Sequence, residues 1–445
     1  MLPSMGGSYF ALAVLFSMNL LNYVDRYSFY AVATHIKEAL KIQDTRLGFL
    51  SSSFMIVYTI VTPFVGWFGD RYSRRWMLAF GVGLWSLATV GTAFSNTFEQ
   101  MFFWRSLLGI GEATYGVIAP ALLADLFPPR VRGRVMGVYF LALPLGGALG
   151  YGIGGWVAGN FHWRTAFLVV GLPGLLVAFA GLLMRDPGRG ASEGHAPEVP
   201  QRRGLGDYLA LFRSRTFLYN TAGMAAVTYA SGGYAVWGST FYQTVRHMSV
   251  EKAGLTIGVL TAVAGLVGIT LGTTLADFLL RFTKRAYLLM ASWAVLAAMP
   301  FGVMGMLEPR VSVSLGILFV AMVLLAMVLG PANAITANVV PPHRRAAGYA
   351  VNIFLIHLFG DISSPIVIGY LSDLFGKTVI TQSPIGALVR SIGAGPVGDN
   401  NLTVGMLSVV PILFLGFIFF AIASRHLPKD QLPATDANPI AGPAH

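Results

Sequence analysis

The sequence contains no cysteine, which excludes disulfide bonds and thiol chemistry. Charged residues are also scarce, because Asp, Glu, Lys and Arg together make up 11% of the 445 residues, whereas soluble domains carry about 25%. Hydrophobic residues reach 55%, and the mean hydropathy is +0.66. This balance predicts an integral membrane protein that crosses the bilayer several times.

The sequence also lacks the short motifs of several enzyme classes. We find no G-x-x-x-x-G-K-[ST] phosphate loop, no G-x-S-x-G nucleophile elbow and no His/Glu cluster with the spacing of metal ligands. The run Gly109-Ile110-Gly111 lies inside an apolar segment rather than after a strand. We therefore expect no enzymatic activity, no cofactor and no bound metal, and a membrane enzyme is the least favoured alternative.

Twelve apolar segments are candidate membrane spans. They lie near residues 9–36, 48–69, 76–94, 98–124, 134–158, 163–184, 216–244, 253–280, 286–307, 312–338, 346–371 and 403–424. Nineteen of the 30 Lys and Arg residues fall on the side that holds both termini, and nine fall on the opposite side. This bias predicts cytoplasmic termini. It also accounts for the net charge of +11 without nucleic acid, which we do not expect as a partner.

A polar segment rich in Pro and Gly divides the chain into two halves that resemble each other. The run 127–132 (FPPRVR) after span four is echoed by the run 340–345 (VPPHRR) after span ten. We expect an all-α membrane protein with twelve transmembrane helices in two six-helix bundles. The predicted parts are an N-terminal bundle at 1–184, a cytoplasmic linker at 185–215, a C-terminal bundle at 216–426 and a disordered cytoplasmic tail at 427–445. The first span is too long for a cleaved signal peptide, so we expect it to remain a helix.

Four ionisable residues are expected at similar depth inside the membrane. Asp25 and Arg26 lie near the middle of the first span, where each charge costs about 2.5–3.5 kcal/mol if it faces lipid. Arg105 and Glu112 lie seven residues apart in span four and share one helix face. Because successive residues cannot point at the same neighbour, we expect Arg26 to pair with Glu112, and Asp25 to face Arg105 or solvent.

Two interpretations of this cluster remain open. In the first, it is a proton switch, because burial favours a neutral carboxylic acid and a nearby guanidinium favours the carboxylate. An arginine that moves between two positions would then drive proton uptake and release, with Asp25 as the main site and Glu112 as the second. In the other interpretation, the cluster is a static ion-pair network that fixes the register of the helices.

The loop after span two predicts a conformational latch. The residues are Gly66, Asp70, Arg71, Arg74 and Arg75, in the spacing G-x-x-x-D-R-x-x-R-R. Gly66 would allow close approach of neighbouring helices, and Asp70 would pair with arginines or with a helix start of the other half. The alternative is an ordinary basic loop. A weaker second copy after span eight contains Gly272, Asp277, Arg281, Lys284 and Arg285.

Further residues are candidates for a substrate cavity. His357 and Asp361 lie one turn apart in span eleven, where they could contact a substrate head group, form a second proton site or simply satisfy each other. Span five, with Pro144 and six glycines, predicts a kinked and closely packed helix. The cavity candidates are Arg26, Arg105, Tyr23, Tyr27, Tyr115, Tyr234, Trp237, His357 and Asp361. For the aromatic residues, ordinary packing or anchoring at the membrane interface is the alternative.

The segment 66–75 (GWFGDRYSRR) resembles the cytoplasmic loop motif of the major facilitator superfamily, and the resemblance covers nearly the whole chain. The stretch 22–26 (NYVDR) is shared by several branches of that superfamily. The runs 109–120 (GIGEATYGVIAP), 124–127 (ADLF), 144–151 (PLGGALGY) and 359–365 (FGDISSP) are similar to the spinster branch.

This resemblance implies a transporter of lysophospholipids or of sphingosine-1-phosphate-like lipids. In that family, charges at the positions of Asp25, Arg26, Arg105 and Glu112 are associated with proton coupling and with the electrostatics of the cavity. The layout of basic loops and the plain termini suit the inner membrane of a bacterium.

We therefore expect a monomeric, proton-coupled secondary active transporter of amphipathic lipids that works by alternating access. One alternative is a proton-coupled transporter of organic anions or drugs. An alternative of another class is a membrane receptor or scaffold that transports nothing.

Overall fold

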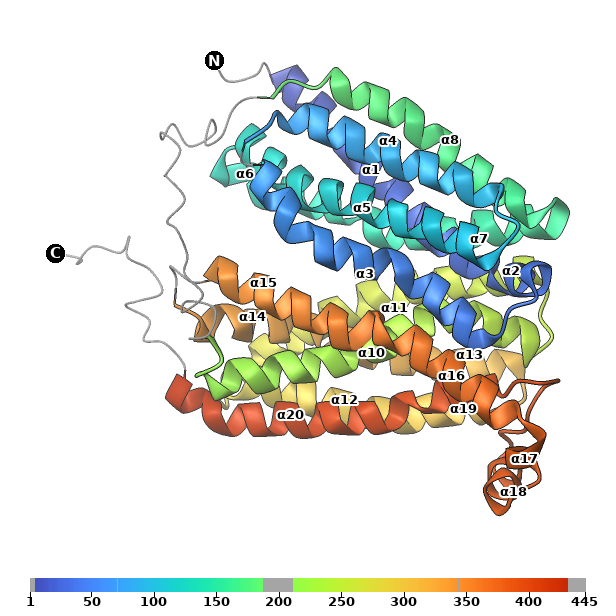
Figure 1. Cartoon of the computed structure of the whole chain (residues 1–445). Helices are drawn as coiled ribbons and strands as arrows, with labels where there is room; N and C mark the ends of the chain where they lie inside the picture. Colours follow the sequence, from blue (N-terminus) through green and yellow to red (C-terminus); the bar gives the residue numbers. More distant parts are fainter. Residues whose placement is uncertain (1–4, 70, 187–210, 342–344, 431–445) are drawn as a thin grey trace. The chain divides into compact units, whose positions relative to one another are not determined.

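A computed structural model describes residues 5–69, 71–186, 211–341 and 345–430. Within these residues the regular structure is helical, apart from an isolated bridge between Val397 and Asn400 (Figure 1). The helices before residue 187 are α1 (Met5–Ala31), α2 (Ala33–Leu40), α3 (Asp44–Gly69), α4 (Arg74–Ala93), α5 (Phe98–Leu126), α6 (Pro129–Phe140), α7 (Ala142–Asn160) and α8 (Trp163–Leu182).

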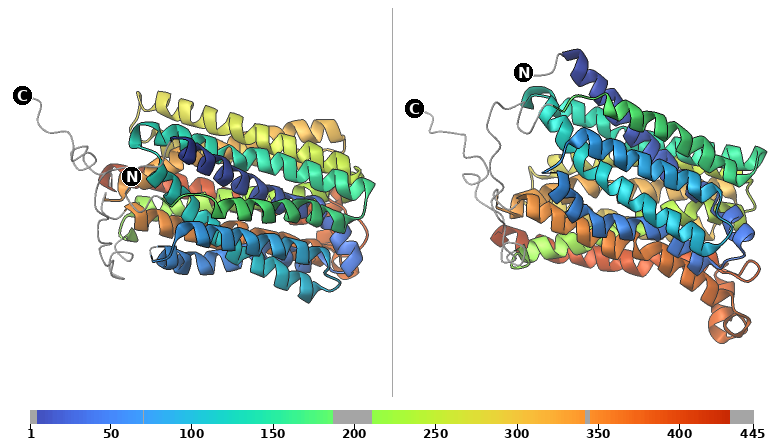
Figure 2. Two further views of the ribbon diagram at one scale, coloured as in Figure 1. Left: turned by 90° about the horizontal axis from the view of Figure 1, so that it is seen from above. Right: turned by 45° about the horizontal axis from the view of Figure 1, so that its top comes forward.

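The later helices follow residue 210. They are α10 (Arg215–Thr244), α11 (Val250–Leu279), α12 (Ala286–Leu307), α13 (Val311–Ala326), α14 (Leu329–Val339), α15 (Arg345–Ile356), the π-helix η2 (His357–Asp361), α16 (Ser363–Gly376), α17 (Thr378–Thr381), α18 (Pro384–Ser391), α19 (Leu402–Leu407) and α20 (Val409–Asp430). Two views in Figure 2 show that the long helices within each half run alongside one another.

The chain separates into two compact units. Unit 1 contains residues Met1–Pro200 and Ala235–Ala262, and unit 2 contains Gln201–Tyr234 and Val263–His445. The end of α10 and the start of α11 thus belong to unit 1, whereas we predicted that they fold with the later helices. Most of the predicted linker and the predicted tail lie outside the described residues, so those boundaries stay predictions.

Eleven stretches among the described residues are long and apolar enough to cross a membrane, and each matches a predicted span. The one predicted span that is not among these eleven is the seventh, at 216–244. It forms α10, an unbroken helix of 30 residues that carries more polar side chains than the others. These side chains are used inside unit 2: Asn220 Nδ2 donates to the Ala332 carbonyl at 3.0 Å, and Thr221 Oγ1 donates to Asn352 Oδ1 at 2.8 Å. The structure is consistent with twelve membrane helices.

Several predicted spans are broken by local changes in backbone geometry. Span five, in which we predicted a kink, is interrupted at Leu141 between α6 and α7, three residues before Pro144. In span eleven, the Ile362 amide donates to the His357 carbonyl at 3.0 Å, the i to i−5 pattern of a π-helix. Pro365 lacks the N–H that would bond to the carbonyl of Asp361, which explains why the regular helix is interrupted there.

The segment between α16 and α19 contains two helices that the sequence pattern does not reveal. Residues 376–401 mix Gly, Pro and Ser without a helical period, but they contain the short helices α17 and α18. The Ser383 side chain caps α18 by accepting a hydrogen bond from the Gly386 amide at 3.2 Å. A cap of this kind can start a helix that is too short to show a clear hydrophobic period.

Glycines let the helices of unit 1 approach closely around the charged cluster. A Cβ atom at Gly150 of α7 would lie 2.6 Å from the Val24 carbonyl oxygen of α1, and one at Gly111 of α5 would lie 2.4 Å from the Gly81 carbonyl oxygen of α4. These contacts confirm the close packing predicted for span five. They also fix the positions of α1, α4 and α5, the helices that carry the charges.

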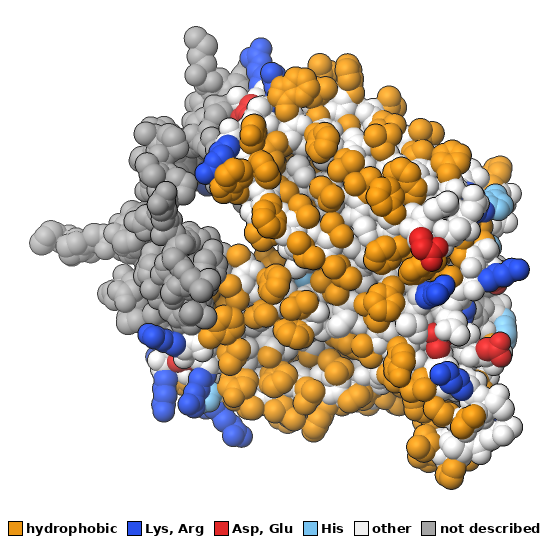
Figure 3. Space-filling model, viewed as in Figure 1, with side chains coloured by type: hydrophobic (Ala, Val, Ile, Leu, Met, Phe, Trp, Pro, Cys, Tyr) orange, Lys and Arg blue, Asp and Glu red, His pale blue; other side chains and the backbone are white. Residues whose placement is uncertain are grey.

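The outer surface of the helices is apolar. On the face shown in Figure 3, hydrophobic side chains cover the flanks of the helices, and Lys and Arg side chains lie towards the helix ends. Large exposed side chains include Phe64, Phe80 and Leu176, which are 62%, 68% and 75% exposed. Such flanks suit the hydrocarbon region of a bilayer, where apolar side chains face lipid.

Candidate functional site

An ion pair joins α1 to α5 inside unit 1. Arg26 Nη2 donates to Glu112 Oε2 at 2.6 Å, and the two side chains are 18% and 1% exposed. The pairing of Arg26 with Glu112 predicted from the sequence is confirmed. A short bond between two charged groups is stronger than a neutral hydrogen bond, and its burial makes it costly to break.

Asp25 faces a different neighbour from the one predicted. Its side chain is buried, and Oδ2 accepts a hydrogen bond from Thr89 Oγ1 of α4 at 2.6 Å. Among the residues that the structure describes, none forms an ion pair with Asp25, and the side chain is only 2% exposed. The predicted direct pairing with Arg105 or solvent is therefore not observed, although Asp25 and Arg105 interact electrostatically. Successive residues point in different directions on a helix, so Asp25 turns towards α4 while Arg26 turns towards α5.

Arg105 lies beneath aromatic rings. Its Nε donates to the Leu50 carbonyl at 3.2 Å, and its guanidinium carbon lies 3.8 Å from the centroid of the Phe29 ring. The side chain is only 1% exposed. The Phe54 ring is near both arginines, with its centroid 4.7 Å from the Arg26 guanidinium carbon and 5.4 Å from that of Arg105. Cation–π contacts of this kind compensate partly for removing a guanidinium from water.

The cluster retains unused hydrogen-bonding capacity. Among the described residues, no partner is found for Asp25 Oδ1, Arg26 Nε, Arg105 Nη2 or Glu112 Oε1. All four ionisable groups therefore have at least one polar atom that could bond to another group. Buried polar atoms without partners are rare in folded proteins and often mark functional sites.

The loop after α3 forms a second polar cluster in unit 1. The Arg74 guanidinium pairs with the Asp125 carboxylate at the end of α5, and the Arg74 amide donates to Asp186 Oδ2 at 3.0 Å. The Arg71 guanidinium lies 3.8 Å from the centroid of the Trp67 ring and donates to the Trp67 carbonyl. These contacts tie the loop to the end of α5 and to Asp186 in the segment that follows α8.

Other predicted latch residues have different surroundings. Asp70 lies outside the described residues, and Arg75 is half-buried. A Cβ atom at Gly66 would meet no atom of the described residues within 4 Å, so the close helix approach predicted there is not observed. In unit 2, Asp277 accepts a hydrogen bond from the Tyr287 hydroxyl of α12 at 2.5 Å.

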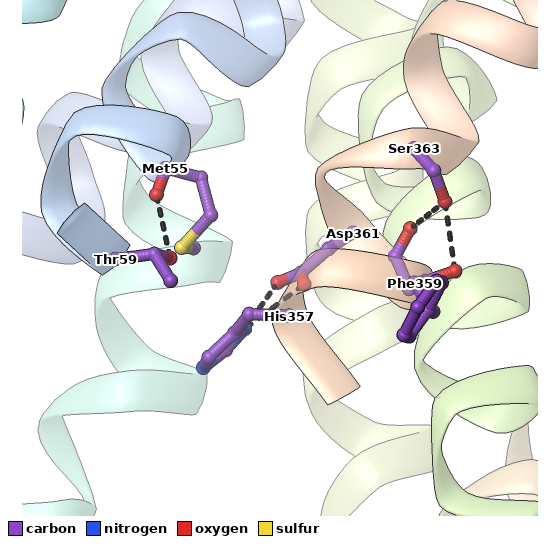
Figure 4. A network of polar contacts seen from close by, with 7 residues as sticks. Met55, Thr59, His357, Phe359, Asp361 and Ser363 are labelled. Atoms are coloured by element: carbon purple, nitrogen blue, oxygen red, sulfur yellow. Dashed lines mark hydrogen bonds and ion pairs between the residues drawn. The ribbon is translucent and has the colours of Figure 1, made fainter. Parts of the chain in front are cut away.

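His357 and Asp361 meet on the π-helix of unit 2, as the sequence predicted. His357 Nδ1 lies 2.9 Å from Asp361 Oδ1 and 3.1 Å from Oδ2, and the side chains are 24% and 23% exposed. Figure 4 shows this pair together with two local contacts, Thr59 to the Met55 carbonyl and Ser363 to the Phe359 and Gly360 carbonyls. Their i, i+4 spacing brings His357 and Asp361 into contact, although neither side chain is fully buried.

The aromatic cavity candidates fall into two groups. Tyr23 and Tyr27 on α1 are half-buried. Tyr115, Tyr234 and Trp237 are 3%, 6% and 0% exposed, which corresponds to the packing alternative rather than to an open cavity wall. Tyr115 also donates its hydroxyl to the Leu15 carbonyl at 3.1 Å, so its polar atom is already used.

Four contributors were missed at the level of sequence. Thr89, Phe29 and Phe54 surround the charges, and Asp125 pairs with Arg74. Of these four residues, only Asp125 could have been identified from the sequence, because it is a carboxylate at the end of a predicted membrane helix and directly precedes a basic loop. Within the described residues, no group of three or more His, Asp or Glu side chains is arranged to hold a metal ion.

Comparisons with known proteins place this architecture in a family. Residues 15–365 match the family model of the Major Facilitator Superfamily. The protein spinster of Drosophila melanogaster is 33% identical over 388 residues, which are 84% of this chain and 64% of that protein. The rat protein spinster homolog 1 is 34% identical over 391 residues, which are 83% of this chain and 74% of that protein.

Solved structures show the same fold. The crystal structure of a bacterial homolog of the human lysosomal transporter spinster, in an inward-facing and unoccupied conformation, has a TM-score of 0.84 at 23% identity and covers 97% of this chain and 99% of that one. The crystal structure of the nucleoside transporter NupG has a TM-score of 0.69 at 15% identity, with 93% of this chain and 98% of that one covered. The chain spans somewhat less than two thirds of the Drosophila relative and about three quarters of the rat relative. Together with the membrane helices, these matches show that the chain is a multi-pass membrane transporter of the spinster branch of the Major Facilitator Superfamily.

Proposed function

We propose that the chain is a proton-coupled secondary active transporter of amphipathic lipids, of the lysophospholipid or sphingosine-1-phosphate-like class, and that it works by alternating access. The observation that carries the proposal is the buried Arg26–Glu112 ion pair beside Asp25. The lipid class follows from the sequence resemblance to the spinster branch.

Arg26 has the properties of a contact for a lipid head group. It is the most exposed of the four charged side chains in the cluster, and its guanidinium lies 5.3 Å from the Tyr23 ring and 4.7 Å from the Phe54 ring. A guanidinium binds phosphate well, and adjacent aromatic rings offer an apolar surface to the chain that follows the head group. Arg105 is more deeply buried, so a head group would reach it only after Phe54 or Phe29 moves.

Asp25 is the proposed main proton site. It interacts electrostatically with Arg105, Glu112 and Arg26, and it holds a hydroxyl hydrogen bond from α4 rather than a guanidinium. Proton uptake at Asp25 would remove a negative charge that attracts Arg105 and Arg26, so that either guanidinium could shift towards Glu112 or towards substrate. Protonation would thereby bias the equilibrium between inward- and outward-open states.

The energy available from one proton is sufficient for modest transport. Moving one charge across 100 mV supplies about 2.3 kcal/mol. Because about 1.4 kcal/mol corresponds to a tenfold ratio, one proton can support a concentration gradient of roughly 50-fold.

The proposal also covers the location of the protein in the membrane and the residues that control its conformational change. We place the protein as a monomer in a bacterial inner membrane with cytoplasmic termini, and with two six-helix bundles joined by a linker at 185–215. The basic loop with Arg71, Arg74 and Arg75 acts as a latch, and His357 with Asp361 contacts the substrate from the second bundle or carries a second proton.

Proteoliposomes test the proposed function. Purified protein is reconstituted, a pH gradient is imposed, and uptake of lysophosphatidylcholine, a sphingosine-1-phosphate analogue and a hydrophilic organic acid is measured. We expect uptake of one or both lipids, and we expect this uptake to stop when the pH gradient is dissipated. The Arg26→Gln variant, measured in the same way, should take up less lipid than the wild type. Uptake of the hydrophilic acid alone would favour an organic-anion transporter, and no flux of any substrate would favour a receptor.

A further inference from the structure

The segment between α16 and α19 exposes apolar side chains outside its bundle. Helices α17 and α18 project beyond α19 and α20 of the same unit (Figure 1, and the right-hand view of Figure 2). Val379, Ile385, Leu388 and Ile392 are 83%, 60%, 65% and 48% exposed. Four large apolar side chains on one short segment indicate a surface that is covered in the working protein.

The apolar residues of α18 lie on one face. Ile385 and Leu388 of α18 and Ile392, the residue that directly follows this helix, have the spacing i, i+3 and i+7, which places them on one side. Ala387 is exposed on the opposite side. Gly386 is buried against the Ile380 and Thr381 carbonyls, where a Cβ atom would lie 2.3 Å from the Ile380 oxygen. The helix is thus held against α17 in one orientation, and its apolar face points away from that contact.

The charges of the segment suit a phosphate-bearing surface. Residues 377–394, which contain α17 and α18, carry Lys377 and Arg390 and no acidic residue, and Asp399 is the acidic residue of the stretch that leads on to α19. Both basic side chains are exposed, and the Arg390 guanidinium also donates to the Thr381 carbonyl, which orients it. A basic and apolar segment of this kind is attracted to the boundary between lipid phosphates and acyl chains.

The position of the segment points to the same partner. The membrane helix α16 ends at Gly376, and the next membrane helix begins with α19 at Leu402. The segment is therefore tethered at both ends at the level where helices leave the bilayer. The membrane helix α20, which follows α19, also exposes apolar side chains, since Phe414 and Leu415 are 46% and 45% exposed.

We propose that α17 and α18 form an interfacial anchor that lies in the surface of the bilayer. Ile385, Leu388 and Ile392 enter the upper part of the acyl-chain region, about 5–10 Å deep. Lys377 and Arg390 contact lipid phosphates. Because the anchor is covalently continuous with α16 and α19, it holds those helices at a fixed depth.

Site-directed spin labelling tests this proposal directly. The chain has no cysteine, so Ile385→Cys, Leu388→Cys and the opposite-face control Ala387→Cys each give one labelling site in the full-length protein. The labelled proteins are reconstituted in vesicles of phosphatidylcholine with phosphatidylglycerol. Collision of the label with oxygen, which concentrates in the bilayer, is compared with collision with a water-soluble nickel chelate. We expect the oxygen-to-nickel ratio to be several-fold higher at 385 and 388 than at 387.

Three outcomes would overturn the anchor. The ratio at 385 and 388 could equal that at 387, which would mean that the apolar face is in water. The label at 388 could be protected from the nickel chelate only at high protein concentration and show short distances to other labels. This result would mean that the apolar face binds a second copy of the protein rather than lipid. Finally, the double variant Lys377→Gln and Arg390→Gln could keep the same dependence of the depth at 388 on phosphatidylglycerol content as the protein without these two changes, which would mean that the two basic side chains do not contact lipid phosphates. We expect the double variant to reduce that lipid dependence.

Discussion

Arg26 and Glu112 are 86 positions apart in the sequence, yet their side chains meet at 2.6 Å between α1 and α5. The carboxylate is almost fully buried and the guanidinium is partly exposed. An ion pair with one open side can be broken by a competing anion or by a change in a neighbouring charge. This geometry gives the proposed transport cycle a specific contact that must form and break.

Replacing Glu112 by Gln should weaken both stability and transport. Gln still accepts a hydrogen bond from Arg26, so we expect a loss of about 1–3 kcal/mol rather than the ~3–5 typical when a buried pair loses one partner. Thermal unfolding in detergent measures the stability, and proteoliposome flux measures the activity. The double variant Arg26→Met with Glu112→Leu should regain stability while staying inactive. A double variant that is less stable than Glu112→Gln would contradict this account of the pair.

Replacing Thr89 by Val should change the pH at which the transporter switches. The Thr89 hydroxyl donates to Asp25 and therefore favours the charged carboxylate. Without it, protonation of Asp25 becomes easier, so the pH-dependent conformational change should move to higher pH. Thr92→Val, one turn away on α4, is the control, since Thr92 donates to the Ala88 carbonyl instead. If the pH midpoint of the conformational change is the same in wild type and in Thr89→Val, this hydrogen bond does not influence the switch.

Replacing Asp125 by Asn should alter the balance of open states. The change removes the charge that pairs with Arg74 at the end of α5, so the loop is held less firmly. We expect a shift in the distribution of distances between fluorophores on the two predicted bundles, with substrate affinity retained. Arg75→Gln changes the charge of the same loop and serves as the comparison. If Asp125→Asn leaves the distribution as in wild type, the latch does not depend on this pair.

Replacing Gly254 by Ala should destabilise the contact between α7 and α11 in unit 1. A Cβ atom at Gly254 would lie 2.5 Å from the Tyr151 carbonyl oxygen, and we expect a cost of about 1–3 kcal/mol. Gly265→Ala on the same helix is the matched control, because a Cβ there meets no described atom within 4 Å. It should be neutral or stabilising by about 0.5–1 kcal/mol. Thermal unfolding of both variants decides the matter, and equal melting temperatures would disprove tight packing at Gly254.

Membrane spans could be predicted well from sequence because their signal is local. Long apolar runs predicted twelve membrane helices. Eleven of them correspond to helices that are long and apolar enough to cross a membrane, and the remaining one corresponds to the more polar helix α10. Helix interruptions were harder, since the π-helix at His357 depends on one missing N–H at Pro365. The short helix α18 was missed because a side-chain cap and contacts with α17 hold it, not a hydrophobic period.

Pairings within the site were only partly predictable. An unpaired charge inside the membrane costs several kcal/mol, so Arg26 and Glu112 each require a partner of opposite charge. This requirement can be recognised from the sequence. Thr89 could not be identified in the same way, because a hydroxyl is inexpensive to bury and occurs on many helices. The rings of Phe29 and Phe54 were missed for a similar reason, since aromatic residues are common throughout the chain.

The central claim is that protonation of Asp25 drives the conformational change, and one measurement tests it most directly. Spin labels are placed on each of the two predicted bundles in wild type and in the Asp25→Asn variant, and their distances are recorded as pH is lowered. The account predicts that distances in wild type change with pH, whereas those in Asp25→Asn stay constant. A full pH response in Asp25→Asn would contradict it, and loss of the response only in Glu112→Gln would move the proton site to Glu112.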